Sequence, residues 1–127
     1  MKIKFYIALF ISLLSLTATA QEAVLTAKVS KNKLGINQRL KIEFTINKQG
    51  GDNFSPPKFS NFKVVGGPSQ SVSQSWINGK VTFSQSYSYI IQPKRKGELT
   101  IGSASIEIAG KNINSKPIKI IVLDAIE

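Results

Sequence analysis

The feature that most constrains this chain is the dipeptide Asn78-Gly79, which interrupts a run of alternating side chains. The alternating residues are Gln70, Val72, Gln74 and Trp76 before the dipeptide, and Val81, Phe83, Gln85, Tyr87, Tyr89 and Ile91 after it. A type I′ turn needs positive φ at both central residues, which Asn-Gly readily adopts. The pattern therefore predicts a long β-hairpin closed by a two-residue turn.

A two-residue turn fixes which residues of the hairpin lie opposite each other. It pairs Ile77 with Lys80, and the remaining partners follow in antiparallel order. One predicted face carries the pairs Trp76–Val81, Gln74–Phe83, Val72–Gln85 and Gln70–Tyr87, and the other carries Ser75–Thr82, Ser73–Ser84, Ser71–Ser86 and Ser69–Ser88. Small hydroxyl side chains pack poorly, so we expect the serine face to be solvated and the opposite face to be buried.

The rest of the chain carries short strand patterns and no competing helix pattern. Residues 40–46 are the clearest case, because apolar and polar side chains alternate there. Further strands are expected at residues 24–29, 34–37, 62–64, 99–101, 104–108 and 117–123, with a loop at 48–57 and a strand break at 65–68. Pro68, the last residue of that break, cannot donate to a central ladder. Many short strands separated by turn signals indicate an all-β fold, an antiparallel immunoglobulin-like β-sandwich.

The first twenty residues have the layout of a cleavable secretory signal peptide. Lys2 and Lys4 precede an apolar stretch, and residues 18–20 (ATA) form a small-residue cleavage site. The alternative is a retained membrane anchor, but a helix of residues 5–20 spans roughly 24 Å, less than a hydrocarbon core of about 30 Å. We therefore expect residues 1–20 to be removed, which leaves residues 21–127 as a single domain exported to the periplasm.

The composition excludes several kinds of site. Neither His nor Cys occurs, so zinc or copper sites built on these ligands and nucleophilic triads with an imidazole are excluded. A calcium site at Asp52 and Asn53 is one alternative, but a plain turn explains these residues better. We expect no catalytic residues, no cofactor and no metal, and hence a protein that is not an enzyme.

The charge of the chain is strongly positive, at +10. Loss of Lys2 and Lys4 with the signal peptide would leave 15 basic and 7 acidic residues, a net charge of +8. One interpretation is affinity for anionic partners, and the other is that solvated lysines keep a β-protein soluble. The basic residues are spread from Lys28 to Lys119, whereas nucleic-acid-binding proteins usually concentrate them on one face. We favour solvated lysines and expect no nucleic-acid partner.

Trp76, beside the predicted turn, is the residue that we single out for binding. Trp is enriched among the residues that dominate protein interfaces, although it could instead pack over Val81 or onto the body of the sandwich. The candidate partner contact is the hairpin tip, which comprises Trp76, Ile77, Asn78, Gly79 and Lys80. Tyr87 and Tyr89 lie farther from the tip and match the apolar face, so we expect them in the core.

Residues 54–59 (FSPPKF) and 62–71 (FKVVGGPSQS) are followed by residues 77–80 (INGK) and 86–89 (SYSY). These segments closely resemble the BatD, or oxygen-tolerance (aerotolerance), family. The most specific part is residues 64–69 (VVGGPS) together with INGK and SYSY at their spacing. Residues 92–97, 100–101, 110–111 and 115–118 fit the same pattern, so the resemblance covers about residues 22–122.

The resemblance implies an exported, non-enzymatic β-domain protein of the bacterial envelope. Family members are encoded beside von Willebrand factor A-type membrane proteins and a MoxR-type ATPase, and are associated with aerotolerance or stress resistance. They carry tandem immunoglobulin-like domains followed by a transmembrane helix, whereas this sequence ends at Glu127 after one expected domain. Membrane attachment is therefore expected only if a longer chain exists, and the family offers no catalytic residues to carry over.

Two functional hypotheses follow from these observations. The leading one is a protein-interaction domain of the envelope that docks through sheet edges or through the long hairpin. The alternative is a carbohydrate- or polyanion-binding module, based on the positive charge, Trp76 and the Ser/Gln-lined hairpin. A structural spacer with no ligand of its own is a third possibility.

Overall fold

The computed structural model describes residues 22–126, which form ten β-strands. They are β1 (Leu25–Val29), β2 (Lys33–Gly35), β3 (Leu40–Ile46), β4 (Asp52–Ser55), β5 (Phe62–Ile77), β6 (Lys80–Pro93), β7 (Gly97–Ile101), β8 (Ser105–Ile108), β9 (Lys111–Asn114) and β10 (Ile118–Leu123). The predicted signal peptide, residues 1–20, lies outside the described residues. No segment of residues 22–126 forms a helix that could cross a membrane.

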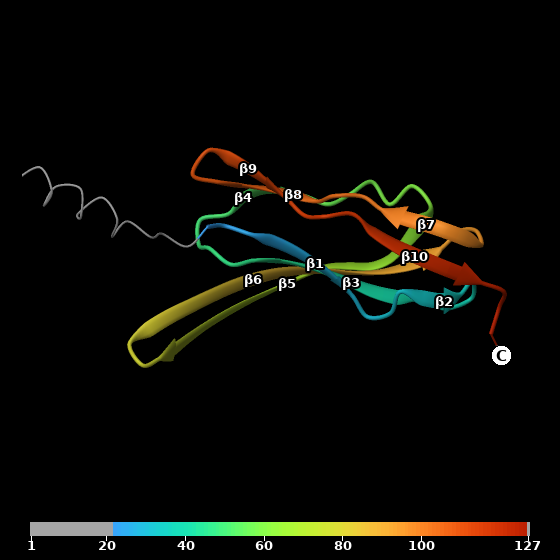
Figure 1. The fold of residues 1–127 in the computed structure, drawn as a ribbon, viewed down its shortest axis with the longest axis horizontal. Helices are drawn as coiled ribbons and strands as arrows, with labels where there is room; N and C mark the ends of the chain where they lie inside the picture. Colours follow the sequence, from blue (N-terminus) through green and yellow to red (C-terminus); the bar gives the residue numbers. More distant parts are fainter. Residues whose placement is uncertain (1–21, 127) are drawn as a thin grey trace, which may run out of the picture.

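Two layers of strands enclose the core (Figure 1). One layer is a four-stranded sheet with the order β1-β3-β6-β5, in which all neighbours are antiparallel. Two three-stranded sheets, β4-β8-β9 and β2-β10-β7, complete the fold, and β4, β7, β8, β9 and β10 lie on the opposite side of the core. The pairing of β2 with β10 is parallel and the other pairings are antiparallel. This arrangement confirms the predicted all-β sandwich.

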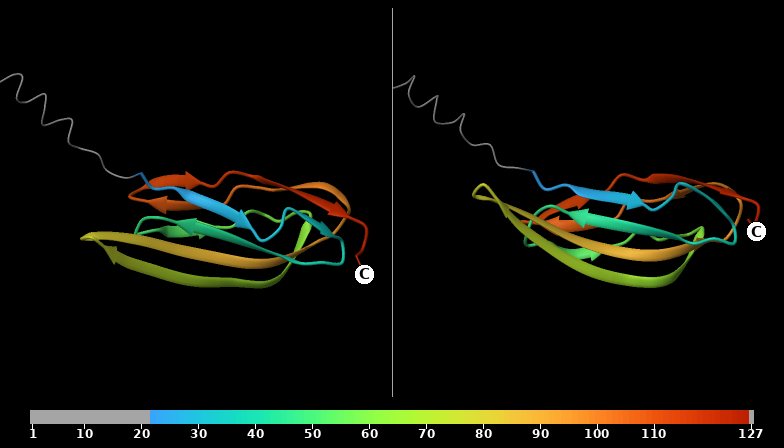
Figure 2. Two further views of the ribbon diagram at one scale, coloured as in Figure 1. Left: turned by 60° about the horizontal axis from the view of Figure 1, so that its bottom comes forward. Right: turned by 90° about the horizontal axis from the view of Figure 1, so that it is seen from below.

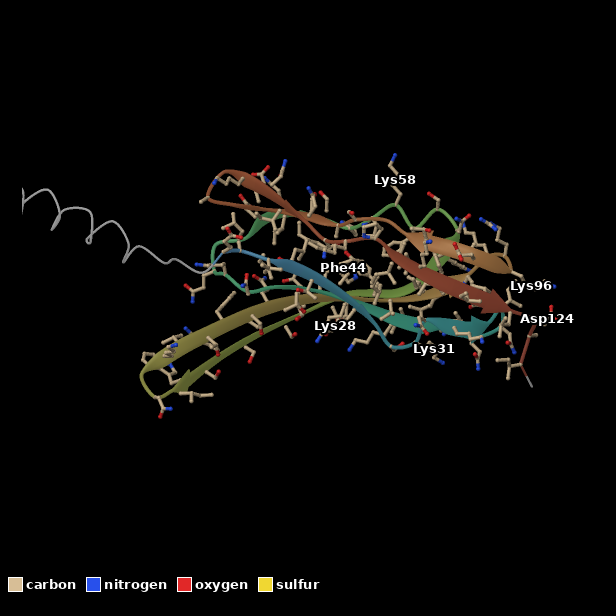
Figure 3. All side chains as sticks on the ribbon, viewed as in Figure 1. Lys28, Lys31, Phe44, Lys58, Lys96 and Asp124 are labelled. Atoms are coloured by element: carbon tan, nitrogen blue, oxygen red, sulfur yellow. The ribbon has the colours of Figure 1, made fainter. Side chains whose placement is uncertain are left out.

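The core follows from the alternation of apolar residues along the strands. In β3, burial alternates from Leu40 to Ile46, and Phe44 lies between the two layers (Figure 3). The largest fully buried side chains come from both layers and are Leu34, Leu40, Ile42, Phe44, Ile46, Ile91, Leu99, Ile101, Ile106 and Ile120. Burying one such side chain stabilises a fold by about 1.5–3 kcal/mol. This apolar cluster therefore holds the layers together.

Two expectations about strand boundaries are wrong. The predicted break at residues 65–68 does not end a strand, because β5 continues through it with register shifts between residues 64 and 69. Pro68 is tolerated there because β5 lies at the edge of its sheet, where a missing N–H costs no ladder bond. The expected loop at residues 48–57 contains β4, which pairs with β8. Its sequence, DNFS, lacks the alternation that identifies the other strands.

The β5–β6 hairpin extends beyond the rest of the sandwich. β5 has 16 residues and β6 has 14, whereas β4 and β8 have 4 each. A strand rises about 3.3 Å per residue. The hairpin is therefore longer than the opposite layer, and no strand of residues 22–126 packs over its turn end. Figures 1 and 2 show its turn end projecting from the body. We call residues 69–85 the distal hairpin, and the face that continues the core side of the sheet its inner face.

Candidate functional site

The turn of the hairpin has the predicted geometry. Asn78 and Gly79 have φ values of 51° and 77°, as a type I′ turn requires. Ile77 pairs with Lys80, and the ladder continues in the predicted register as far as Ser69 opposite Ser88. The predicted hairpin and its pairing are therefore confirmed.

The candidate contact residues lie together on the projecting tip. Trp76 is 73% exposed and Ile77 is 64% exposed, and Asn78, Gly79 and Lys80 are also exposed. Trp76 stands opposite Val81 on the inner face. Trp76 therefore does not pack onto the body of the sandwich, which was one of the two alternatives to a role in binding. The other alternative, packing over Val81, agrees with its place opposite that residue.

The expected burial of the inner face is wrong for the distal hairpin. Val72 is 63% exposed and Val81 is 45% exposed, while Phe83 is half-buried. The expectation is confirmed for Tyr87 and Tyr89, which belong to the core. The physical reason is the length of β5 and β6, since these strands continue past the end of the opposite layer. An apolar surface thus remains in solvent around Trp76.

The serine face is solvated along β5, as predicted, but not along the whole of β6. Ser86 is buried, with 9% exposure, which corrects the expectation for that position. Its Oγ lies 2.9 Å from Thr45 Oγ1 on β3, and the Ser88 hydroxyl donates to Glu43 Oε2 at 3.4 Å. At these positions β6 has a neighbour on each side, so its small side chains are enclosed by those of β3 and β5.

A hollow opens at the base of the distal hairpin, on its inner face. Its lining includes Phe54, Pro68, Gln70 and Tyr87. The rings of Phe54 and Tyr87 stack with centroids 4.0 Å apart and planes 2° apart. Sequence reasoning missed this hollow, because Phe54 lies in the segment that was expected to be a loop. The arrangement offers an aromatic surface beside an exposed strand edge.

The two tyrosines of this region are held in their neutral form. Burial raises the pKa of the Tyr87 phenol, and the nearby charge of Asp52 raises it further. Burial also raises the pKa of Tyr89, with a smaller contribution from Tyr87. Both rings therefore act as apolar packing groups at neutral pH.

Acidic side chains are scattered over the described surface. Residues 22–126 contain no group of three acidic side chains placed to hold a metal ion. Around Asp52, the carboxylate accepts a hydrogen bond from the backbone N–H of Asn53 at 2.9 Å. The Asn53 side-chain amide donates to Glu107 Oε2 at 3.2 Å. These hydrogen bonds join the polar side chains of Asp52 and Asn53 to their own turn and to Glu107 on β8.

Most basic residues have no acidic partner. Among the described residues, the ion pairs are Lys96 with Asp124 at 2.6 Å and Lys119 with Glu98 at 3.7 Å. Lys96 and Asp124 lie at the end opposite the hairpin turn (Figure 3). Their hydrogen bond, followed by their charge attraction, raises the pKa of Lys96 and lowers that of Asp124. Both pairs are exposed, so they contribute little to stability.

Comparison with known proteins finds a match to one family model. A family model described as the BatD DUF11 like domain matches residues 27–122. No curated protein and no solved structure matches the chain. The matched range begins in β1, ends in β10 and includes the whole β5–β6 hairpin.

Proposed function

Because the chain belongs to the BatD family, we propose that it is a non-enzymatic interaction domain of a BatD-like envelope complex linked to aerotolerance or stress resistance. In this proposal the domain acts in the periplasm after removal of residues 1–20. Its partners are von Willebrand factor A-type membrane proteins of the MoxR-linked system.

The observation that carries the proposal is the exposed apolar surface of the distal hairpin. Val72, Trp76, Ile77 and Val81 are each at least 45% exposed, and they lie on one projecting element. Single exposed apolar residues are common, but a gathered group of them usually marks an interaction site. A tryptophan near the tip is a typical anchor for such a site.

The proposed lack of enzymatic activity is supported by the residue types that the chain holds. A sequence without His and Cys has no imidazole base and no thiol nucleophile. The tyrosines near the hollow have pKa values raised above 10.0, so at neutral pH their phenols are protonated and do not accept a proton. Binding, rather than proton transfer, is the chemistry that these side chains support.

The experiment is capture of envelope proteins by the tagged, exported chain. Trp76→Ala removes the most exposed apolar side chain of the hairpin, at 73% exposure, and Leu123→Ala removes an exposed apolar side chain of β10, at 42% exposure, as the control away from the hairpin. We expect the wild type and Leu123→Ala to capture a von Willebrand factor A-type protein and Trp76→Ala to capture much less. Equal capture by Trp76→Ala, or no capture of such a protein by the wild type, would contradict the proposal.

A second candidate function is binding of an anionic polysaccharide. It is favoured by the scarcity of ion pairs, since only Lys96 and Lys119 among the described basic side chains have an acidic partner. Electrostatic binding weakens as salt screens the charges. Retention of the purified chain on a heparin column at low salt, lost at high salt, is the expected result. A chain that flows through at low salt would eliminate this function.

A further inference from the structure

The distal part of β5 forms an edge of the four-stranded sheet. Its neighbour is β6 on one side, and no strand lies on the other side in the part of the chain that the structure describes. The turn makes Ile77 and Lys80 a hydrogen-bonded pair, and such pairs alternate along an antiparallel ladder. The backbone groups of the odd-numbered residues 69–77 therefore face β6, and those of Gln70, Val72 and Gln74 face the open edge.

Residues 69–77 of this edge lack the protection that strand edges usually have, whereas Pro68 and the register shifts of β5 lie directly before them. Proteins protect edges with short strands, Lys, Pro or bulges. The opposite edge of the same sheet, β1, has 5 residues and carries Lys28. In contrast, residues 69–77 of β5 (SQSVSQSWI) contain no charged residue and no proline. The distal edge is thus open to pairing with another strand.

The sequence of this edge is symmetric about one residue. Residues 69–75 read SQSVSQS in both directions, with Val72 at the centre. Two copies aligned antiparallel on Val72 place Ser69 opposite Ser75 and Gln70 opposite Gln74, so each residue meets one of its own type. A twofold interface joins a surface patch to the same patch of the second copy, and in this alignment the palindrome gives that patch matched pairs of uncharged side chains.

We propose that two copies of this chain associate by antiparallel pairing of their β5 edges, with the twofold axis at Val72. This inference rests on the proposed function, in which the distal hairpin is the interaction surface, and it adds a second copy of the chain to the partners of that surface. About six backbone hydrogen bonds join the copies, from Gln70, Val72 and Gln74 of each chain. The two four-stranded sheets become one continuous sheet.

The same alignment gives the exposed Trp76 a counterpart on the second copy. It places Trp76 of one chain opposite Pro68 of the other, directly beyond the regular part of the ladder, which begins at Ser69. Pro68 lines the hollow that also contains the stacked rings of Phe54 and Tyr87. Pairing therefore covers an apolar side chain and fills an aromatic hollow at both ends of the interface.

The first test places charges on the proposed axis. Val72 is 63% exposed, so Val72→Lys and Val72→Glu leave the core intact. We expect each variant alone to self-associate about tenfold more weakly than the wild type, because like charges oppose each other across the axis. An equimolar mixture of the two variants should recover the dimer. Leu123→Lys, on β10, is the control and should leave the dimer unchanged.

Sedimentation of the purified, exported chain from micromolar to millimolar concentration measures these changes, and circular dichroism checks that each variant is folded. A wild type that stays monomeric over that range would overturn the inference. A wild-type dimer that neither charged variant weakens would also overturn it, because the pairing would then lie elsewhere.

The second test determines the alignment of the two copies by disulfide cross-linking. The native sequence contains no cysteine, so a disulfide can form only between the introduced cysteines. Ser69→Cys and Ser75→Cys are each about 20 Å from their own counterparts in the proposed dimer, but next to each other across it. We expect a disulfide in the mixture of the two variants and none in either variant alone. Cross-linking within a single variant, or none in the mixture, contradicts the alignment on Val72.

Both tests use the purified chain alone, which separates this inference from the proposed function. A monomeric chain that still captures a von Willebrand factor A-type protein would refute the self-pairing and leave the proposed function standing. A dimeric chain that captures no such protein would support the self-pairing and refute the proposed function.

Discussion

The two ends of the β5–β6 ladder have the same alternation but opposite environments. On the inner face of β6, Ile91 is fully buried and Tyr87 is 8% exposed, whereas Val81 is 45% exposed. Opposite Val81, Trp76 is 73% exposed. Burial thus falls steadily along one face of one strand, from the end near Pro93 to the turn.

This difference shows that sharing a face of a sheet and being buried are separate properties of a side chain. Alternation determines which side chains share a face of a sheet, because successive residues point to opposite sides. Whether that face is buried depends on the length of the opposing layer. Here β4 and β8 are short, so the inner face is core at one end of the ladder and exposed to solvent at the other.

The largest expected effect comes from shortening one inner-face side chain at each end of β6. Ile91→Ala should lower the free energy of unfolding by about 2–5 kcal/mol, because it opens a cavity in a closed core. Val81→Ala, on the same strand and face, should lower it by less than about 0.5 kcal/mol. Urea unfolding of both variants beside the wild type gives the comparison. Similar losses at the two positions would mean that the distal hairpin is covered in solution.

The register of the hairpin was predictable because it depends on local chemistry. Asn78-Gly79 specifies the turn, and the turn specifies each opposite pair. The alternation in residues 40–46 identified β3 for the same kind of reason. The core positions of Tyr87 and Tyr89 followed from the face that they share with Ile91.

The remaining features depend on contacts between distant segments. Phe54 is placed by stacking on Tyr87, and nothing in the DNFS sequence of β4 indicates that contact. Ser86 is enclosed because Thr45 and Ser71 lie beside it on neighbouring strands. The tip residues of the candidate site were found from the turn alone, but the hollow and the open edge of β5 required the sheet order.

An intermediate effect is expected from two glycines, Gly67 directly before the distal hairpin and Gly79 in its turn. A Cβ on Gly67 would lie 2.5 Å from the carbonyl oxygen of Ser88 and 3.1 Å from Cα of Tyr89, and the φ of Gly67 is +95°. Gly67→Ala should therefore cost about 1–3 kcal/mol of stability. Gly79→Ala meets no atom within 4 Å, so only its φ of +77° opposes the change, at about 1 kcal/mol.

Thermal and urea unfolding of the two alanine variants tests this contrast. Gly67 holds β5 against the buried part of β6, so its variant should lose global stability. Gly79 lies at the exposed tip, so its variant should show its loss mainly as faster amide exchange near the turn. A Gly79→Ala variant less stable globally than Gly67→Ala would mean that the tip, rather than the base, secures the hairpin.

The smallest expected effect is a loss of stability in alkali that originates at the boundary between the two ends. Burial raises the pKa of Tyr87, and of Tyr89 beside it, above the ordinary value of 10.0. Below pH 10 the phenols are neutral in both the folded and the unfolded chain, so their contribution to stability is complete. As the pH rises above 10 the unfolded chain ionises first, and this contribution is lost as the pH passes through the folded pKa values.

Replacing both tyrosines with phenylalanine isolates that contribution, because the wild type and the variant differ only in the two hydroxyl groups. We expect the double variant Tyr87→Phe, Tyr89→Phe to lose less unfolding free energy between pH 9 and pH 11 than the wild type, and to match its trend below pH 9. Urea unfolding at each pH measures the difference. Parallel curves above pH 10 would place the phenols in solvent, and the boundary between the buried and the exposed end of the ladder would then lie closer to Ile91 than to Phe83.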